Sequence, residues 1–373
     1  MKIIIGRKKF LDVLSQVQDI VAKEEIMPIL AHILVEAVDD FVKITATNLE
    51  VSYMGICDCR VVKKGKMLLH AKKLYEILKV LPEGDISLEK KENNWVNLEQ
   101  DNIKYNLMCL STNEFPVIRS YEKDDFFVIE REILGGMIDK TLFAVADVGS
   151  SNYNISGAFL EKIDKNVIRM VGTDGRRLSL IDKGIQEKND IPLKKGVIIP
   201  KKGVRKVKSF LDSGEKKFIF LRLEEKAIII KDNIGTLVVN LIMGHYPDYR
   251  SIISGEKSCK SEFLVYKSDL ISALKRVSIL TEGENYPVKL DLEKNKMTVH
   301  SESSEFGNVK EEIEIVYSNE NISFCLNAFY LLDVLRVIEG EQVKFLFSGN
   351  EEPLFIRDSL DDTFLSIIMP IKL

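Results

Sequence analysis

The chain has 373 residues, of which 45% are hydrophobic and 29% are charged, and its formal net charge at pH 7 is −4. These proportions are those of globular proteins, and they exclude a disordered, collagen-like or disulfide-scaffold chain. At roughly 100–200 residues per domain, the length predicts two or three domains. The near-zero net charge, taken alone, argues against a nucleic-acid binder.

Cysteine usage and apolar runs predict the compartment. The five cysteines are an odd number and show neither a CxxC pair nor zinc-finger spacing, so we expect reduced thiols in a cytosolic protein. The first nine residues become charged at once and contain no apolar signal core. No apolar run approaches the 18 residues that a membrane-spanning helix needs. We therefore expect a cytoplasmic protein with no membrane segment.

Six amphipathic helices are predicted, two in each third of the chain. In the second of them, Leu74, Ile77, Leu78 and Leu81 lie at positions i, i+3, i+4 and i+7, which places them on one helical face. In chain order the predicted helices lie around 10–17, 71–81, 133–138, 200–211, 270–277 and 327–338.

These helices and the strand patterns between them repeat along the chain. The helices that start at 71, 200 and 327 are separated by 129 and 127 residues. Polar turns that follow strands repeat as well, at Thr47-Asn48, at Thr173-Asp174 and, more loosely, at Ser301-Glu302. Such a period indicates repeated structural units. Because strands outnumber helices and the connections are short, we expect an α+β fold with antiparallel sheets.

The repeats predict three similar domains, each of them a doubled unit of one helix and several strands. Polar stretches at 119–125 and 251–261 are the expected boundaries. The predicted domains are therefore 1–122, 123–255 and 256–373. Repetition alone suggests a symmetric scaffold with an extended surface, and it does not identify a ligand.

No constellation of catalytic residues is apparent. The sequence contains no GxxxxGK[ST] phosphate loop, no GxGxxG motif and no GxSxG elbow. Its four histidines lie far apart and show no metal-ligand spacing. We therefore predict no catalytic residue, no metal site and no cofactor, and a hydrolase with an unrecognised site is only a distant alternative.

Positive charge is concentrated on the predicted helices. Residues 201–212 carry five basic side chains and one acidic side chain. Across all six helical segments the net charge is +8, which leaves −12 for the rest of the chain. Lysines often decorate any solvated helix face, but the asymmetry between helices and strands is hard to explain in that way. If the repeats are arranged symmetrically, these helices would form one surface suited to phosphates without reading base sequence.

Several segments, in the right order on a triplicated chain, resemble one family. They are Val171-Gly-Thr-Asp-Gly-Arg-Arg-Leu178, Tyr246-Pro-Asp-Tyr-Arg250, Asn327-Ala-Phe-Tyr-Leu-Leu-Asp333 and Ile367-Ile-Met-Pro-Ile-Lys-Leu373. Together with the segment at 27–30, they resemble the bacterial sliding clamps, the β subunits of DNA polymerase III. The resemblance covers the whole chain.

The resemblance implies a head-to-tail homodimeric ring of six similar domains. Helices would line the hole around duplex DNA, which the ring would bind independently of base sequence, and sheets would form the outside. Such a ring is not an enzyme, and it would confer processivity by raising the effective concentration of a tethered polymerase at the template. The implied partners are a second copy of the chain, double-stranded DNA, the catalytic subunit of DNA polymerase III, clamp-loader subunits and repair or other polymerases. The proteins would bind through short linear peptides.

The family's peptide-binding groove lies between the second and third domains. Apolar residues there would bury the peptide, while Arg177 and the Thr173 hydroxyl would orient its backbone. Two positions depart from the family pattern: Arg176 replaces a usual His, and Ser251 replaces a common second Arg. The groove residues implied are Ile155, Thr173, Gly175, Arg176, Arg177, Leu178, Pro247, Ile252, Tyr330, Ile368, Met369, Pro370 and Ile371.

The family also implies a surface that faces DNA and a surface that closes the ring. Glu24 and Glu25 occupy a loop that is often basic in the family, which leaves Lys23 as the candidate there. The DNA-facing residues implied are Lys23, Lys72, Lys73, Lys201, Lys202, Arg205 and Lys206. The ring contact implied pairs Tyr105 and Leu107 of the first domain with Ile279 and Leu280 of the third. A protein-binding scaffold of the same fold that does not encircle DNA remains the alternative function.

Overall fold

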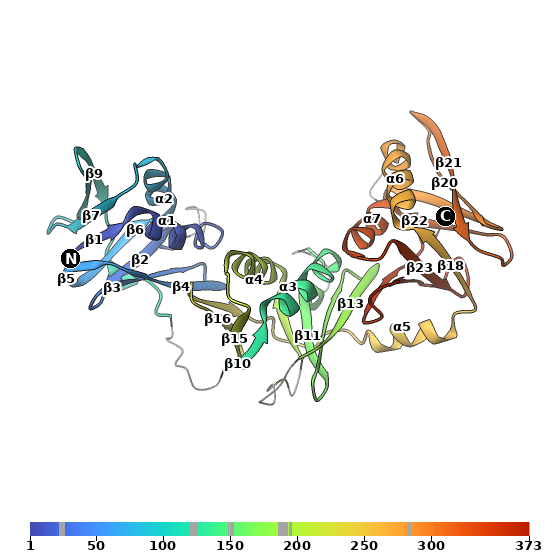
Figure 1. Ribbon diagram of the computed structural model, residues 1–373, viewed down its shortest axis with the longest axis horizontal. Helices are drawn as coiled ribbons and strands as arrows, with labels where there is room; N and C mark the ends of the chain where they lie inside the picture. Colours follow the sequence, from blue (N-terminus) through green and yellow to red (C-terminus); the bar gives the residue numbers. More distant parts are fainter. Residues whose placement is uncertain are drawn as a thin grey trace. The chain divides into compact units, whose positions relative to one another are not determined.

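The computed structural model describes residues 1–21, 27–118, 126–147, 149, 153–185, 193, 196–281 and 285–372. The chain forms two compact units, which comprise Met1–Glu132 with Lys202–Leu241, and Ile133–Lys201 with Ile242–Leu373. Each unit is built from helices on antiparallel sheets (Figure 1), as the α+β prediction requires. Among the described residues, no helix is long and apolar enough to cross a membrane.

The first unit contains two antiparallel sheets. Their strands alternate buried and half-buried residues, as in β2, because side chains on successive residues point to opposite faces of a sheet. The five-stranded sheet has the order β5 (Arg60–Lys63), β1 (Lys2–Gly6), β7 (Asp85–Lys90), β8 (Trp95–Gln100) and β9 (Ile103–Met108). The eight-stranded sheet has the order β10 (Phe127–Glu130), β15 (Phe218–Leu223), β16 (Ala227–Lys231), β17 (Thr236–Asn240), β4 (Val51–Asp58), β3 (Phe41–Thr47), β2 (His32–Ala37) and β6 (Gly65–His70).

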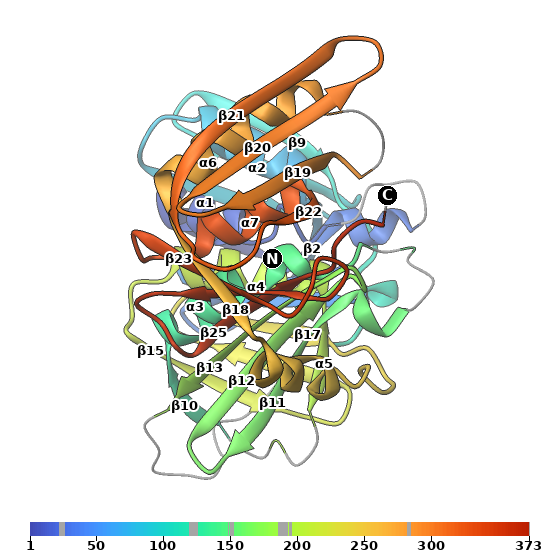
Figure 2. The same cartoon turned by 90° about the vertical axis from the view of Figure 1, so that its right-hand side faces the viewer.

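The second unit contains one twelve-stranded sheet, whose long β20–β21 hairpin lies at the top of Figure 2. The strands that run through the middle of this sheet are buried along most of their length, as in β25. The strand order is β14 (Val197–Pro200), β11 (Gly157–Asp164), β12 (Val167–Thr173), β13 (Arg177–Gly184), β25 (Phe364–Ile368), β24 (Leu354–Asp358), β23 (Gln342–Phe347), β18 (Ser261–Tyr266), β21 (Gly307–Val316), β20 (Lys296–Ser303), β19 (Pro287–Glu293) and β22 (Ile322–Asn327).

All six predicted helices are present. Their predicted apolar faces are the faces that pack on the sheets: Leu74 and Leu78 of the second helix are fully buried, and so are Leu270 and Leu274 of the fifth. The helices are α1 (Arg7–Ser15), α2 (Ala71–Val80), α3 (Arg131–Asp139), α4 (Lys201–Ser213), α6 (Lys267–Val277) and α7 (Ala328–Val337). The sequence prediction did not include the short helix α5 (Arg250–Ser254), which overlaps the start of the expected boundary stretch 251–261.

The same ionic cap joins the two helices of every repeat. The basic residue that begins the first helix of each pair donates to carbonyl oxygens at the end of the second helix. Arg7 donates from Nε to the Leu78 carbonyl (2.7 Å), Arg131 from Nη1 to the Leu211 carbonyl (2.6 Å), and Lys267 from Nζ to the Ile338 carbonyl (2.7 Å). A cation is favourable at this position because the last carbonyl groups of a helix carry partial negative charge.

The predicted polar turns are also equivalent in structure. In the first two repeats a threonine hydroxyl accepts from the amide two residues later: Leu49 N donates to Thr47 at 3.0 Å, and Gly175 N donates to Thr173 at 3.1 Å. The third turn is shifted by two residues from the predicted Ser301. The hydroxyl of Ser303 accepts there, from the amide of Glu305 at 3.2 Å. The longer β20–β21 hairpin moves the turn farther along the chain.

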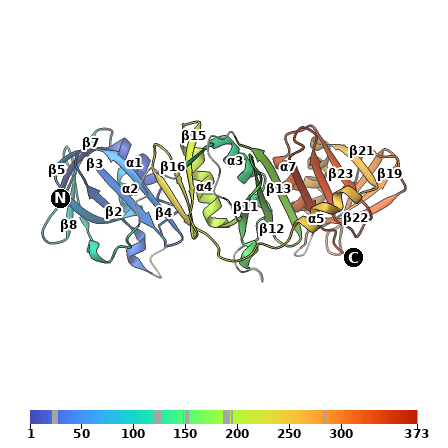
Figure 3. The same cartoon turned by 90° about the horizontal axis from the view of Figure 1, so that it is seen from below.

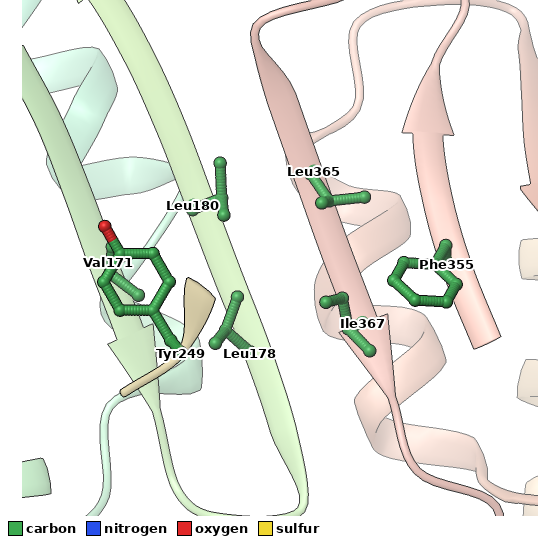
Figure 4. Close-up of a cluster of buried hydrophobic side chains, with 7 residues drawn as sticks. All are labelled: Val171, Leu178, Leu180, Tyr249, Phe355, Leu365 and Ile367. Carbon is green, nitrogen blue, oxygen red and sulfur yellow. The ribbon is translucent and has the colours of Figure 1, made fainter. Parts of the chain in front are cut away.

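Hydrogen-bonded strands join consecutive repeats within each unit. In the first unit β17 pairs with β4, and in the second β13 pairs with β25 from Arg177↔Ile368 to Ile181↔Phe364. Figure 4 shows leucine and isoleucine side chains on β13 and β25 gathered with Val171 and Tyr249 in one buried cluster. The predicted boundary at 122/123 lies outside the described residues. That at 255/256 lies in the first turn of the short 3-10 helix Gly255–Ser258, which follows α5 directly.

Candidate functional site

The turn between β12 and β13 is a hydrogen-bonded polar element of the predicted groove. The carboxylate of Asp174 accepts from the amides of Arg176 (2.9 Å) and Arg177 (3.0 Å). Thr173 donates its hydroxyl to the Arg177 carbonyl at 2.6 Å, and Gly175 adopts φ +87°, a conformation that favours glycine. The Thr173 hydroxyl therefore shapes this turn, and its proton is already donated within the chain.

Arg177 connects this turn to α7. Its Nε donates to Asp174 (3.0 Å), its Nη1 to Asp333 (2.8 Å) and its Nη2 to the carbonyl of Phe143 (2.6 Å). Its guanidinium carbon lies 4.1 Å from the ring centroid of Tyr330. Because all three guanidinium nitrogens already have acceptors within the chain, Arg177 acts as a structural link between the β12–β13 turn and α7. Burial raises the pKa of the Tyr330 phenol, which stays neutral.

The segment after β25 continues across the same region without forming a strand. The amide of Met369 donates to the carbonyl of Arg176 (2.9 Å), and the amide of Ile371 donates to the carbonyl of Cys325 (2.7 Å). These two bonds fix the segment between the β12–β13 turn and strand β22. Met369 remains 41% exposed, so its side chain is available to a ligand.

Two adjoining pockets flank Met369 and Arg176. The hydrophobic pocket has a volume of about 190 Å³ and is lined by Ile155, Thr173, Gly175, Arg176, Arg177, Leu178, Pro247, Asp248, Tyr249, Ile252, Ile367 and Met369. The polar pocket has a volume of about 200 Å³ and is lined by Arg176, Asn285, Asn327, Tyr330, Met369, Pro370 and Ile371. Every predicted groove residue except Ile368 lines one of these pockets.

Ile368 is the exception because strand geometry turns it away. Its side chain is completely buried, and it pairs with Arg177, whereas Ile367 pairs with Leu178. Cross-strand partners share a face, so Ile367 lies beside Leu178 in the hydrophobic pocket. The sequence Phe-Leu-Ser-Ile-Ile of β25 does not alternate, so it gave no signal for this one-residue correction. Asp248, Tyr249 and Asn327, which lie within quoted motifs, were also missed, and so was Asn285, which lies in none of them.

Arg176 lies where the two pockets meet. Its side chain is exposed, and its Nη1 donates to the side-chain oxygen of Asn285. Because this acceptor is an uncharged amide, the bond does not neutralise the guanidinium charge. A histidine, the residue expected from the resemblance, would be largely neutral at pH 7. Arg176 thus makes the centre of the groove more positive.

The segment from Tyr246 to Ile252 forms the opposite wall of the hydrophobic pocket. Tyr246 stacks on Phe159 with 4.8 Å between ring centroids, and Tyr249 is 2% exposed. The hydroxyl of Tyr249 donates to the carboxylate of Glu161. Burial raises the pKa of Tyr249 to about 12, so this phenol remains a hydrogen-bond donor at neutral pH.

The predicted DNA-facing residues divide into two groups. Lys72 and Lys73 of α2 are exposed, as are Lys202 and Arg205 of α4. The spacing of Lys202 and Arg205 places both on one helical face. These four side chains are free to meet phosphates, although Lys73 also pairs with Glu76 at 2.9 Å.

Lys201 and Lys206 differ from this expectation. Lys201 is 9% exposed, and its ammonium group donates to the carbonyl of Val145 and, at 2.8 Å, to Asp147. Lys206 is 5% exposed, and burial lowers its pKa. The alternation of exposed and buried positions along α4 turns both toward the protein. The predicted Lys23 lies outside the described residues.

The predicted ring-contact residues are partly or largely exposed to solvent. Tyr105 and Leu107 are half-buried on β9, the edge strand of the five-stranded sheet. Ile279 is 78% exposed beside half-buried Leu280, in the 3-10 helix Ser278–Leu280 that follows α6. An isoleucine this exposed is unusual for a structural core position.

Comparison with known proteins places the whole chain in one family. The DNA polymerase III beta subunit models match residues 1–119 (N-terminal domain), 128–248 (central domain) and 257–372 (C-terminal domain). The beta sliding clamp of Buchnera aphidicola subsp. Rhopalosiphum padi is 30% identical, and that of Chlamydia muridarum 27%, with 100% of this chain covered in both and 100% and 99% of those proteins.

Solved structures agree with the sequence relatives. The DNA polymerase sliding clamp of Caulobacter crescentus superposes with a TM-score of 0.93 at 28% identity, and both chains are covered completely. The DNA polymerase III beta subunit of Thermotoga maritima gives a TM-score of 0.90 at 25% identity, covering 100% of this chain and 99% of that chain. The resemblance seen in the sequence is thus confirmed: the chain has three clamp domains and belongs to the DNA polymerase III β-subunit family, the non-catalytic β sliding clamps.

Proposed function

We propose that the protein acts as a homodimeric ring that encircles duplex DNA and tethers the replicative polymerase and other DNA-processing proteins. The observation that carries this proposal is the pair of adjoining pockets around Met369 and Arg176, because twelve of the thirteen groove residues implied by the resemblance line them. We further propose the domain boundaries 1–122, 123–255 and 256–373, and a cytoplasmic location.

The groove suits a short linear peptide with apolar side chains. Leu178, Pro247 and Ile252 supply an apolar surface in the hydrophobic pocket, while Tyr330 and Asn327 supply polar groups in the polar pocket. Pockets of this kind gain affinity from burial and specificity from a few polar groups. We propose that it receives peptides of the DNA polymerase III catalytic subunit, of clamp-loader subunits and of repair or other polymerases.

The DNA-facing surface that we propose is narrower than the sequence prediction. It consists of the exposed residues Lys72 and Lys73 of α2 and Lys202 and Arg205 of α4. Contacts of such residues to phosphates are independent of base sequence and weaken steeply with salt. Enclosure of the duplex would remove the need for tight binding, and weak contacts let the ring slide.

Ring closure would use two open sheet edges. Strand β9 ends the five-stranded sheet. Strand β21 pairs with β18 through Val316 and Ile315, and the rest of its length pairs, among the described residues, with β20 on one side. We propose that β9 of one protomer meets the third domain of the next, with Tyr105 and Leu107 against Ile279 and Leu280. A heterologous contact that closes on itself gives a ring.

Retention on circular DNA tests this function. Protein loaded onto nicked circular DNA by a clamp loader should remain bound through gel filtration, and linearising the DNA afterwards should release it. A scaffold that does not encircle DNA would not respond to DNA topology. Equal retention on circular and linear DNA would contradict the proposal.

A further inference from the structure

A segment that we call the outer strap crosses the junction of β13 and β25 in the second unit. The outer strap comprises residues 246–259, including α5, which Figure 3 shows beside the strands of this junction. Tyr249 belongs to the buried cluster of Leu178, Leu365 and Phe355, and Ile253 and Cys259 pack against the same cluster. The outer strap thus rests on strands of both the second and the third domain.

Two carboxylates fasten the outer strap at opposite ends. At its start, Glu161 of β11 accepts from the hydroxyl of Tyr249 and from Nη2 of Arg250 at 2.5 Å. At its end, Glu256 accepts from Nε and Nη2 of Arg357 on β24, both at 2.6 Å. Both are ion pairs between an arginine and a glutamate, but the first connects to the second domain and the second to the third.

Only the first of these two pairs acts on residues of the groove. Tyr249, which Glu161 holds, lines the hydrophobic pocket together with Pro247 and Ile252 on either side of it in the chain. Glu256 and Arg357 do not line either pocket described above. The two carboxylates therefore offer a matched comparison on one segment.

The environment of Glu161 fits a positioning task. Its side chain is 7% exposed, whereas that of Arg250 is 60% exposed. Glu161 accepts from Tyr249 and from Arg250 through separate oxygens, and a neutral amide at this position would have only one acceptor oxygen for the two donors. Tyr249 would then be held less firmly, whereas the exposed guanidinium of Arg250 can be solvated by water. The guanidinium of Arg250 also lies 5.3 Å from the ring centroid of Tyr249, so the three side chains form one group.

We propose that Glu161 is a positioning residue of the peptide groove, which holds the wall formed by Pro247, Tyr249 and Ile252 at the spacing that a peptide side chain requires. This inference rests on the peptide-binding function proposed above. It assigns to Glu161 an effect on peptide affinity, although Glu161 does not line either pocket described above.

The test compares Glu161→Gln with Glu256→Gln. Each substitution replaces by an amide one of the two carboxylates that fasten the outer strap. The probe is a fluorescein-labelled synthetic peptide with the sequence of the C-terminal tail of the same organism's replicative polymerase, followed by fluorescence anisotropy on the full-length protein. We expect E161Q to raise the Kd about five- to tenfold, which lies within the range of coupling between contacting residues. We expect E256Q to change it less than about twofold.

Two further measurements separate positioning from a general loss of structure. Hydrogen exchange should become faster at the amides of 249–254 in E161Q and stay unchanged in strand β12. The double variant E161Q/R250Q should bind no more weakly than E161Q, because the pair acts as one unit.

Equal effects of E161Q and E256Q, or wild-type affinity in E161Q, would overturn the positioning role while leaving the groove itself intact. If the wild-type protein failed to bind the peptide, the groove proposal would fall first and the positioning role with it. The two failures are thus distinguishable.

Discussion

Replacement of Arg177 is the perturbation whose effect can be worked out most fully from the structure. In Arg177→Ala, the carboxylate of Asp174 loses its ion-pair partner, and that of Asp333 keeps only Arg336 at 3.1 Å. The carbonyl of Phe143 loses a donor as well. The Arg177 side chain is 11% exposed, and the two carboxylates are 18% and 26% exposed. Removing one partner of a buried ion pair costs about 3–5 kcal/mol.

Partial exposure of the two carboxylates reduces this cost, because water can solvate them after the change. We therefore expect a loss of about 3 kcal/mol in the free energy of unfolding. For a unit of about 200 residues this corresponds to a fall in Tm of roughly 6–12 °C. Differential scanning calorimetry of the full-length protein would record this fall in Tm. Hydrogen exchange would identify which calorimetric transition involves strand β13.

The neighbouring arginine is the matched control. Arg176 is exposed and donates to a neutral amide, so Arg176→Ala should change the unfolding free energy by less than about 0.5 kcal/mol, as surface substitutions usually do. Arg177→Lys should be intermediate, because a lysine keeps the charge but not the forked geometry. A Tm within about 2 °C of wild type for Arg177→Ala would refute this account of the groove's support.

Three further predictions concern the DNA surface, the groove and an ion pair on β13. The double variant Lys202→Glu/Arg205→Glu should weaken DNA binding and reduce the slope of log affinity against log salt concentration by about 0.9 for each phosphate that α4 no longer neutralises. An unchanged slope in this variant would show that α4 is not part of the DNA surface. Lys201→Gln should instead lower the stability of the protein, because the buried ammonium group of Lys201 pairs with Asp147. Deleting residues 369–373 should abolish peptide binding in the anisotropy assay while sedimentation still shows a dimer, and full affinity after the deletion would contradict the groove. Burial alone would raise the pKa of Asp361, but hydrogen bonds from Thr363, Lys140 and Lys183 hold that pKa well below its usual value. The ionised carboxylate of Asp361 should therefore contribute fully to stability above the pKa of an unfolded aspartate, about 3.9. This contribution should be lost as the pH falls below that pKa. Asp361→Asn should accordingly cost about 3 kcal/mol at pH 7, and the difference from wild type in urea unfolding should shrink toward pH 3, whereas a pH-independent difference would assign the loss to packing.

The regular elements of the fold followed from the sequence because they depend on local periodicity. Six helices appear where apolar residues recur every three to four positions, and two of the three polar turns lie where they were predicted. The short helix α5 was not predicted, since five residues from Arg250 to Ser254 are too few to show a periodic pattern. The third turn was misplaced because the length of a hairpin is set by strand pairing.

The site was predictable as a set of segments and less so as individual side chains. The motifs brought Leu178, Pro247 and Met369 together correctly, but a motif does not state which face of a strand a residue occupies. Ile367 was missed and Ile368 included for that reason. The sequence also could not show that Lys201 and Lys206 turn inward, because burial of a lysine depends on partners such as Asp147, which is far away in the chain.

The sheets that run through both repeats of a unit have a consequence for the integrity of the molecule after chain cleavage. Strands β13 and β25 are paired over five residue positions, and the outer strap lies across the same junction. A protease that cut the polypeptide between the second and third repeats would therefore break a covalent connection without separating the products. The nicked protein should migrate intact on a native gel and fall apart only in denaturant, because association across the junction is carried by backbone hydrogen bonds and buried side chains rather than by the continuity of the chain.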